Sequence, residues 1–155
     1  MLKELFDRMV GDSDELLDQT PVVLCFVMCK GELLLLRRTL QVDFYKGWWS
    51  VVAGVWDEKR VIEEKVREKI TQELGVLATE HIQSLKLGRS YSFYDSVLEK
   101  GWCMHPVFVE LDEKPWIYLN TQHQTFRWVN PSDMRQYDVI PSLADAFERF
   151  VALAV

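Results

Sequence analysis

Apolar runs and turn residues divide the first third of this 155-residue chain into short blocks. The runs Val22 to Cys29 and Glu32 to Arg38 are β-rich, and Lys30-Gly31 between them predicts a hairpin turn. A third short strand is predicted over Trp48 to Ala53, which ends before Gly54 and a charged loop. This part of the chain therefore predicts neighbouring strands of one sheet.

A helical period replaces the strand pattern over Val61 to Leu74, and Gly75 is placed to end that helix. Two further helices are predicted near the end of the chain, a short one opened by Asn130-Pro131 and a last one over Leu143 to Leu153. The last helix is expected to pack on the sheet through the apolar residues Leu143, Phe147, Phe150 and Val151.

The remaining blocks predict more strands and one more helix. Strands are expected over Ile82 to Phe93, Trp102 to Leu111 and Phe126 to Val129. The apolar stripe within Leu2 to Leu17 predicts an N-terminal helix. The order of elements predicts an α+β fold in which helices cover a mixed β-sheet, not a strict βαβ alternation. We expect one domain over residues 1–155, with residues 1–20 as a helical extension.

Composition limits the classes of partner. Lys and Arg number 18 and Asp and Glu 24, which gives a net charge of −6 and disfavours binding to duplex nucleic acid. A small phosphorylated ligand in one local basic pocket is compatible with that charge. The longest apolar runs are too short to cross a bilayer, and the N-terminus lacks the apolar core of a secretory signal. These patterns predict a cytoplasmic protein that does not bind membranes.

Cysteine spacing predicts reduced thiols. Cys25 and Cys29 share one face of a predicted strand, about 13 Å apart, which is too far for a disulfide. With Cys103 the count is three, and we expect buried thiols in preference to a metal site.

The segment from Gly54 to Val76 resembles the box of the Nudix (MutT-like) hydrolase family. It has a glycine, a loop, a helix and the closing residues Glu73-Leu74-Gly75-Val76, with the spacing of the box and no gap. The preceding Trp48 to Ala53 and the later His123 to Pro131 are similar to flanking strands of the family. The resemblance implies a Nudix-type α/β/α sandwich with a mixed sheet.

The resemblance also implies a reaction. The family hydrolyses a diphosphate bond in nucleotides and related compounds, and glutamates on one face of the box helix hold Mg²⁺ or Mn²⁺. In this chain Arg60 stands where the family has a glutamate in the loop, and Glu68-Lys69 stands where the family has an Arg-Glu pair. The Glu-Glu pair is Gln72-Glu73, so only Glu73 remains in register.

A helical wheel shows which side chains share a face at about 100° per residue. The buried stripe is predicted to contain Ile62, Val66, Ile70 and Leu74. Glu73 lies beside that stripe, where Lys65, Lys69 and Gln72 continue the same flank, whereas Glu63, Glu64 and Glu68 are expected to face water. Lysines beside a single carboxylate repel a divalent cation, which predicts weak Mg²⁺ or Mn²⁺ affinity.

From the resemblance and the wheel we take Glu73 as the candidate catalytic residue and metal ligand. The candidate substrate-binding residues are Lys65, Lys69, Gln72, Arg37 and Trp56. Solvated helix charges explain Lys65 and Lys69 equally well, and Arg37 and Arg38 at a strand end are compatible with a plain surface role. His105 is expected to be structural, and His123 in a loop is a weaker candidate for the site.

Two functions from different classes remain open. The first is a Nudix hydrolase that acts on a nucleoside diphosphate-linked or related phosphoanhydride substrate and uses Glu73 as its metal ligand. The second is a Nudix-fold module that no longer hydrolyses and binds a ligand or a partner. An unrelated α+β domain is a third and weaker alternative. The amphipathic N-terminal segment and the tryptophan-rich strands are compatible with a homodimer.

Overall fold

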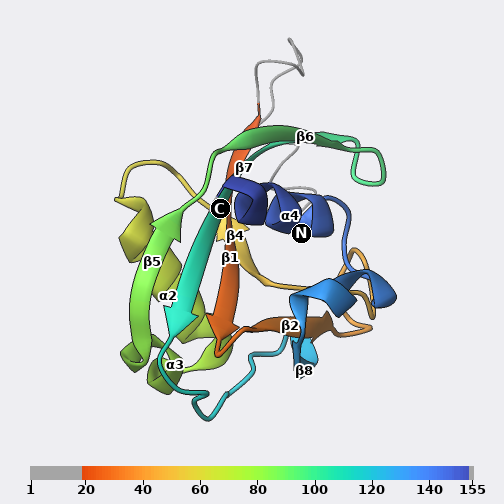
Figure 1. Cartoon of the computed structure of the whole chain (residues 1–155). Helices are drawn as coiled ribbons and strands as arrows, with labels where there is room; N and C mark the ends of the chain where they lie inside the picture. Colours follow the sequence, from red (N-terminus) through yellow and green to blue (C-terminus); the bar gives the residue numbers. More distant parts are fainter. Residues whose placement is uncertain (1–18, 154–155) are drawn as a thin grey trace.

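The computed structural model describes residues 19–153, without the side chains of residues 150–153. These residues form one sheet and the helices around it (Figure 1). The elements are, in chain order, β1 (Thr20–Cys29), β2 (Glu32–Arg38), β3 (Trp49–Ser50), β4 (Val52–Val55), α2 (Ile62–Leu74), α3 (Val76–Glu80), β5 (Ile82–Leu87), β6 (Tyr91–Asp95), β7 (Lys100–Leu111), β8 (His123–Val129), the 3₁₀ helix η1 (Pro131–Gln136) and α4 (Leu143–Leu153). Among them, no helix has both the length and the apolar character needed to span a membrane.

Strand β1 is the centre of the sheet. It runs parallel to β7 along its whole length, and the other pairs of named strands are antiparallel. Its second edge is shared between β4, which pairs with Val22 to Cys25, and β2, which pairs near Met28 and Cys29. Because β2 and β4 pair with different ends of the same edge of β1, the sheet divides into two branches there. The strands β3 and β8 both pair with β2 and extend its branch. The predicted mixed sheet is confirmed.

The predicted hairpin turn is also present. Lys30 and Gly31 have φ angles of 50° and 82°. Two successive residues with positive φ match the turn type whose twist suits a two-residue hairpin, and glycine adopts such angles without a steric penalty.

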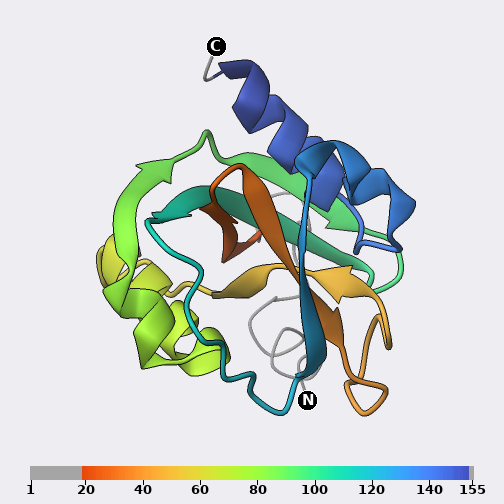
Figure 2. The same cartoon turned by 60° about the horizontal axis from the view of Figure 1, so that its bottom comes forward.

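The two faces of the sheet carry separate cores. Figure 2 shows α2 and α3 on one side of the sheet and η1 and α4 on the other. Alternate residues of β1 face opposite sides, so Val23 and Cys25 pack toward α2 and α3, while Leu24 and Phe26 pack toward η1 and α4. The predicted helix stripe is fully inaccessible at Val66, Ile70 and Leu74 and half-buried at Ile62. The resulting layers are helix, sheet and helix.

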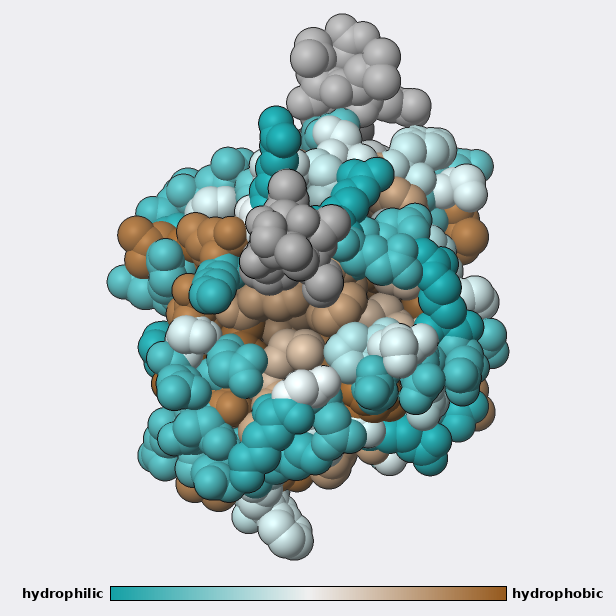
Figure 3. Space-filling model, in the orientation of Figure 1, coloured by the Kyte–Doolittle hydropathy of each residue, from teal (hydrophilic) through white to brown (hydrophobic). Residues whose placement is uncertain are grey.

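The α4 face is not covered evenly. Leu143 and Phe147 of α4 are buried against Phe26, as expected, whereas Phe108 stays half-buried. In the space-filling view this face has a hollow with an apolar floor and a hydrophilic rim (Figure 3).

Several predicted boundaries are wrong. The expected strand Ile82 to Phe93 is two strands, because the chain turns at residues 88–90, where Gly88 N–H donates to Pro106 O. The expected strand Trp48 to Ala53 is interrupted at Val51. Gly75, at a φ of 100°, ends α2 but leads directly into α3, which the sequence did not indicate.

Two expectations lie outside the described residues. These are the N-terminal helix over Leu2 to Leu17 and the packing of Phe150 and Val151.

A buried carboxylate fastens the β2–β3 loop to the turn between β6 and β7. The Tyr45 hydroxyl donates to Asp95 at 2.7 Å from Oδ2 and 2.8 Å from Oδ1, and the Val97 and Leu98 amides also donate to Oδ1. Asp95 is only 6% exposed, so its charge depends on these donors. The contact holds the loop that follows Arg38 against a distant hairpin.

Replacing Tyr45 with Phe should therefore destabilise the fold. A hydrogen bond to a charged group contributes about 2 kcal/mol, and its loss leaves Asp95 with one donor fewer. Urea unfolding at pH 7 measures the change. Tyr94→Phe is the matched control, because Tyr94 is 56% exposed, and it should leave the midpoint unchanged. Equal midpoints for Tyr45→Phe and the native chain would contradict the assignment.

Candidate functional site

Glu73 occupies a buried position at the end of α2. It is 2% exposed and follows Ile70 and precedes Leu74 on the helix face that packs on the sheet. The Ala53 backbone amide of β4 donates to its carboxylate. An acidic side chain at such a depth is rare unless it is paired, and Glu73 has two cationic neighbours, Lys69 on its own helix and Arg38 on β2.

Lys69 is the nearest of these neighbours. Its ammonium lies 3.2 Å from Glu73 Oε2, one helical turn away, and its side chain is 16% exposed. The aliphatic stem crosses directly over Gly54, where a Cβ atom would lie 2.7 Å from Lys69 Cε. Gly54 is therefore required for this path of the lysine, independently of any turn conformation.

Arg38 and His123 complete the surroundings of the carboxylate. His123 begins β8 opposite Arg38 of β2, and its Nδ1 lies 3.7 Å from Glu73 Oε1, beyond hydrogen-bond distance. Arg38 is half-buried, acts on Glu73 through its charge and donates from Nε to Phe44 O at 3.1 Å. The site thus joins α2, β2, β4 and β8.

Burial dominates the protonation of this cluster. It raises the pKa of Glu73 to about 7, against the opposing effects of Lys69, Ala53 and Arg38. It lowers the pKa of His123 to about 4, and the cations Arg38 and Lys69 act in the same direction. At neutral pH the imidazole is therefore uncharged, and the carboxylate changes its protonation in the neutral range.

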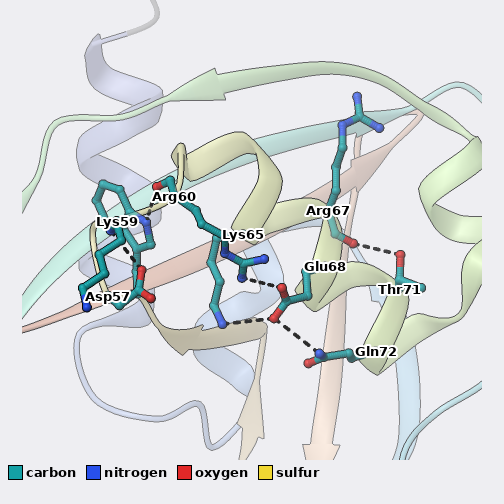
Figure 4. A network of polar contacts seen from close by, with 9 residues as sticks. Asp57, Lys59, Arg60, Lys65, Arg67, Glu68, Thr71 and Gln72 are labelled. Carbon is teal, nitrogen blue, oxygen red and sulfur yellow. Dashed lines mark hydrogen bonds and ion pairs between the residues drawn. The ribbon is translucent and has the colours of Figure 1, made fainter.

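The first half of the box helix carries a second, more exposed network (Figure 4). Glu68 forms ion pairs with Arg60 and Lys65 and lies 3.4 Å from the Gln72 amide nitrogen. The ion pair between Arg60 and Glu68 ties the loop before α2 to the helix. The ion-pair partners of Glu68 are Arg60 and Lys65, whereas the partner of Glu73 is Lys69, so the two carboxylates belong to separate sets of contacts.

The donor set does not fit a divalent metal ion. Mg²⁺ requires a near-octahedral shell of oxygen ligands, usually with carboxylates. The helix offers Glu73 alone, and an ammonium already faces its Oε2. Over residues 19–153, no group of three or more His, Cys, Asp or Glu side chains is arranged to hold a metal ion.

The structure does not bring all the candidate residues together. Lys69 and Glu73 are in contact, whereas Lys65 and Gln72 belong to the Glu68 network. The Trp56 indole donates to Arg60 O and packs edge-on against His105. Arg37 points to the α4 face, because its neighbour Arg38 takes the Glu73 face.

Two residues of the cluster were not among those chosen from the sequence. Strand alternation from Leu34 and Leu36 would have selected Arg38, since all three share one face. His123 was expected in a loop, and no local signal places it at the buried start of β8.

Comparison with known proteins gives a consistent result. The model of the NUDIX domain matches residues 18–150. The nucleoside triphosphatase NudI of Escherichia fergusonii is 26% identical over 125 residues, which is 78% of this chain and 89% of that protein. A MutT protein from Methanosarcina mazei has a TM-score of 0.69 and 19% identity over 88% of this chain and 95% of its own. An Ap4A hydrolase from C. elegans has a TM-score of 0.66 and 14% identity over 87% and 97%.

The raised pKa of Glu73 predicts a dependence of stability on pH. The folded pKa of about 7 lies above the ordinary value of 4.5, so the folded state binds the proton more tightly and this residue's contribution falls as pH rises from 4.5 to 7. The Glu73→Gln variant has no titrating group at this position, so its free energy of unfolding lacks this dependence on pH. Its stability relative to the native chain should increase by about 2 kcal/mol between pH 5 and pH 7.

Urea unfolding of both proteins at the two pH values measures this difference. Glu63→Gln is the matched control, since Glu63 is exposed on the same helix, and its difference from the native chain should not change with pH. A Glu73→Gln difference that is also independent of pH would show that the buried carboxylate is ionised throughout.

Proposed function

Because the chain belongs to the NUDIX domain family, we propose that it binds a small phosphorylated ligand of the nucleotide type at the box helix, and that Lys69 acts there in place of a divalent metal ion. Nudix hydrolases generally use divalent metal ions, and the Nudix relatives of this chain act on small phosphorylated nucleotides. The observation that carries the proposal is the contact between the Lys69 ammonium and Glu73.

Charge at the site supports this reading. Lys69 and Arg38 are two cations beside one carboxylate, so the cluster has an excess positive charge even when Glu73 is ionised. Protonation of Glu73 increases that excess, and His123 stays neutral. A lysine binds phosphate as a point charge, and partial burial strengthens the attraction because solvent screens it less. Lys69 keeps 16% of its side chain exposed, so this residue is not sealed from solvent as Glu73 is.

A hydrolase that acts on a nucleoside phosphoanhydride is the second candidate. One observation favours it, because Glu73 has a pKa near the operating pH, as a general base requires. The relatives named nucleoside triphosphatase are compatible with this activity. Release of phosphate from a nucleotide panel that depends on Mg²⁺ or Mn²⁺ would favour this candidate over the binding function.

Binding should not need a metal ion and should depend on Lys69. We expect calorimetry with ADP in the presence of EDTA to give measurable affinity, and Lys69→Gln to weaken it at least tenfold. Lys86→Gln is the control, because it removes one exposed lysine from β5. Affinity that appears only with added Mg²⁺, or an equal loss in both variants, would contradict the proposal.

The double variant Lys69→Glu with Gln72→Glu should raise affinity for Mg²⁺. It replaces the ammonium that faces Glu73 by a carboxylate and adds a second carboxylate at the exposed position 72, and carboxylates are the oxygen ligands that Mg²⁺ requires. Calorimetric titration of Mg²⁺ into the native chain and the variant compares them, and phosphate release then tests for recovered hydrolysis. Tight Mg²⁺ binding by the native chain, unchanged in the variant, would place the metal ligands elsewhere.

A further inference from the structure

Two arginines meet one tryptophan on the face of the sheet that carries α4. The guanidinium carbon of Arg37 lies 5.9 Å from the centre of the Trp49 ring, and that of Arg127 lies 6.0 Å from it. Arg127 is also 5.9 Å from the Tyr137 ring and donates to the Tyr137 hydroxyl at 3.4 Å. We name Arg37, Trp49, Arg127 and Tyr137 the arginine–indole cluster.

The cluster joins elements that are distant in sequence. Trp49 of β3 pairs with Arg37 of β2, and β8 brings Arg127 opposite Leu35. Tyr137 follows η1 and packs edge-on against Trp49, with 5.4 Å between ring centres. The aromatic rings are half-buried and both arginines are exposed, so the charged ends face solvent above a low-dielectric floor.

Among the residues that the structure describes, no carboxylate pairs with either guanidinium group. Arg37 donates from Nε to Gly47 O, and Arg127 donates to the Tyr137 hydroxyl. In a chain of net charge −6, two unpaired cations over one ring form a local positive site. Their mutual repulsion disfavours the arrangement until an anion lies between them.

We propose that the arginine–indole cluster binds the phosphate or diphosphate group of a small molecule. The planar fork of a guanidinium matches two phosphate oxygens at once, and this cluster holds two such forks near one ring. Cations over an indole keep a fixed orientation at little entropic cost, which prepares both forks for the ligand.

This site is distinct from the one around Glu73. Arg37 and Arg38 are consecutive residues of a strand, and their side chains lie on opposite faces of β2. The inference therefore does not rest on the function proposed for Lys69, and each can fail without the other.

The test uses the full chain carrying Lys69→Gln, so that the box helix no longer contributes. Inorganic pyrophosphate is titrated by calorimetry and by ¹H–¹⁵N spectra of the tryptophan indoles, with Trp49→Phe assigning the Trp49 signal. We expect pyrophosphate to bind, to shift the Trp49 indole, and to bind at least tenfold more weakly after Arg127→Gln. Arg127→Lys keeps the charge without the fork and should lose less.

Arg89→Gln is the control for net charge, since Arg89 is exposed outside the cluster. Three results would overturn the proposal: an equal loss in Arg89→Gln and Arg127→Gln, no shift of the Trp49 indole at saturation, or tighter binding of malonate than of pyrophosphate. The last would show a carboxylate site instead.

Discussion

The contact between Lys69 and Glu73 organises this end of the molecule. A carboxylate that is 2% exposed needs compensation, and the ammonium one helical turn away supplies most of it. The lysine reaches that position only by lying over Gly54, so a glycine of β4 and the register of α2 are fixed together. Arg38 of β2 and His123 of β8 lie beside the same carboxylate. Arg38 also positions the β2–β3 loop, because its Nε donates to Phe44 O.

Two sets of polar contacts with different requirements lie along the box helix. Arg60 and Glu68 form an ion pair that ties the preceding loop to the helix. Lys69 faces Glu73 from one helical turn away, and the Gln72 amide belongs to the Glu68 network. An ion pair needs only two opposite charges, whereas a Mg²⁺ site requires several oxygen donors, which one buried carboxylate beside an ammonium does not supply.

Cationic side chains are distributed on both faces of β2. Arg38 serves the Glu73 side, and Arg37 with Arg127 faces α4 above Trp49. A chain of net negative charge thus places positive charge at two defined positions. Each of these cationic positions is bounded by buried or aromatic groups, which lower the local dielectric constant. The attraction of an anion to these positions therefore depends more on the local charge and dielectric than on the net charge of the chain.

The sequence by itself determined the hairpin at Lys30-Gly31, the apolar stripe of α2 and the position of Glu73 beside it, because each depends on spacing within one segment. It also indicated the mixed sheet and the family, since the box and its flanks lie in a fixed order. Tertiary structure alone decided that His123 is buried beside Glu73 and that Arg127 reaches Trp49. These facts depend on pairing between strands far apart in the chain, and no local pattern encodes that register.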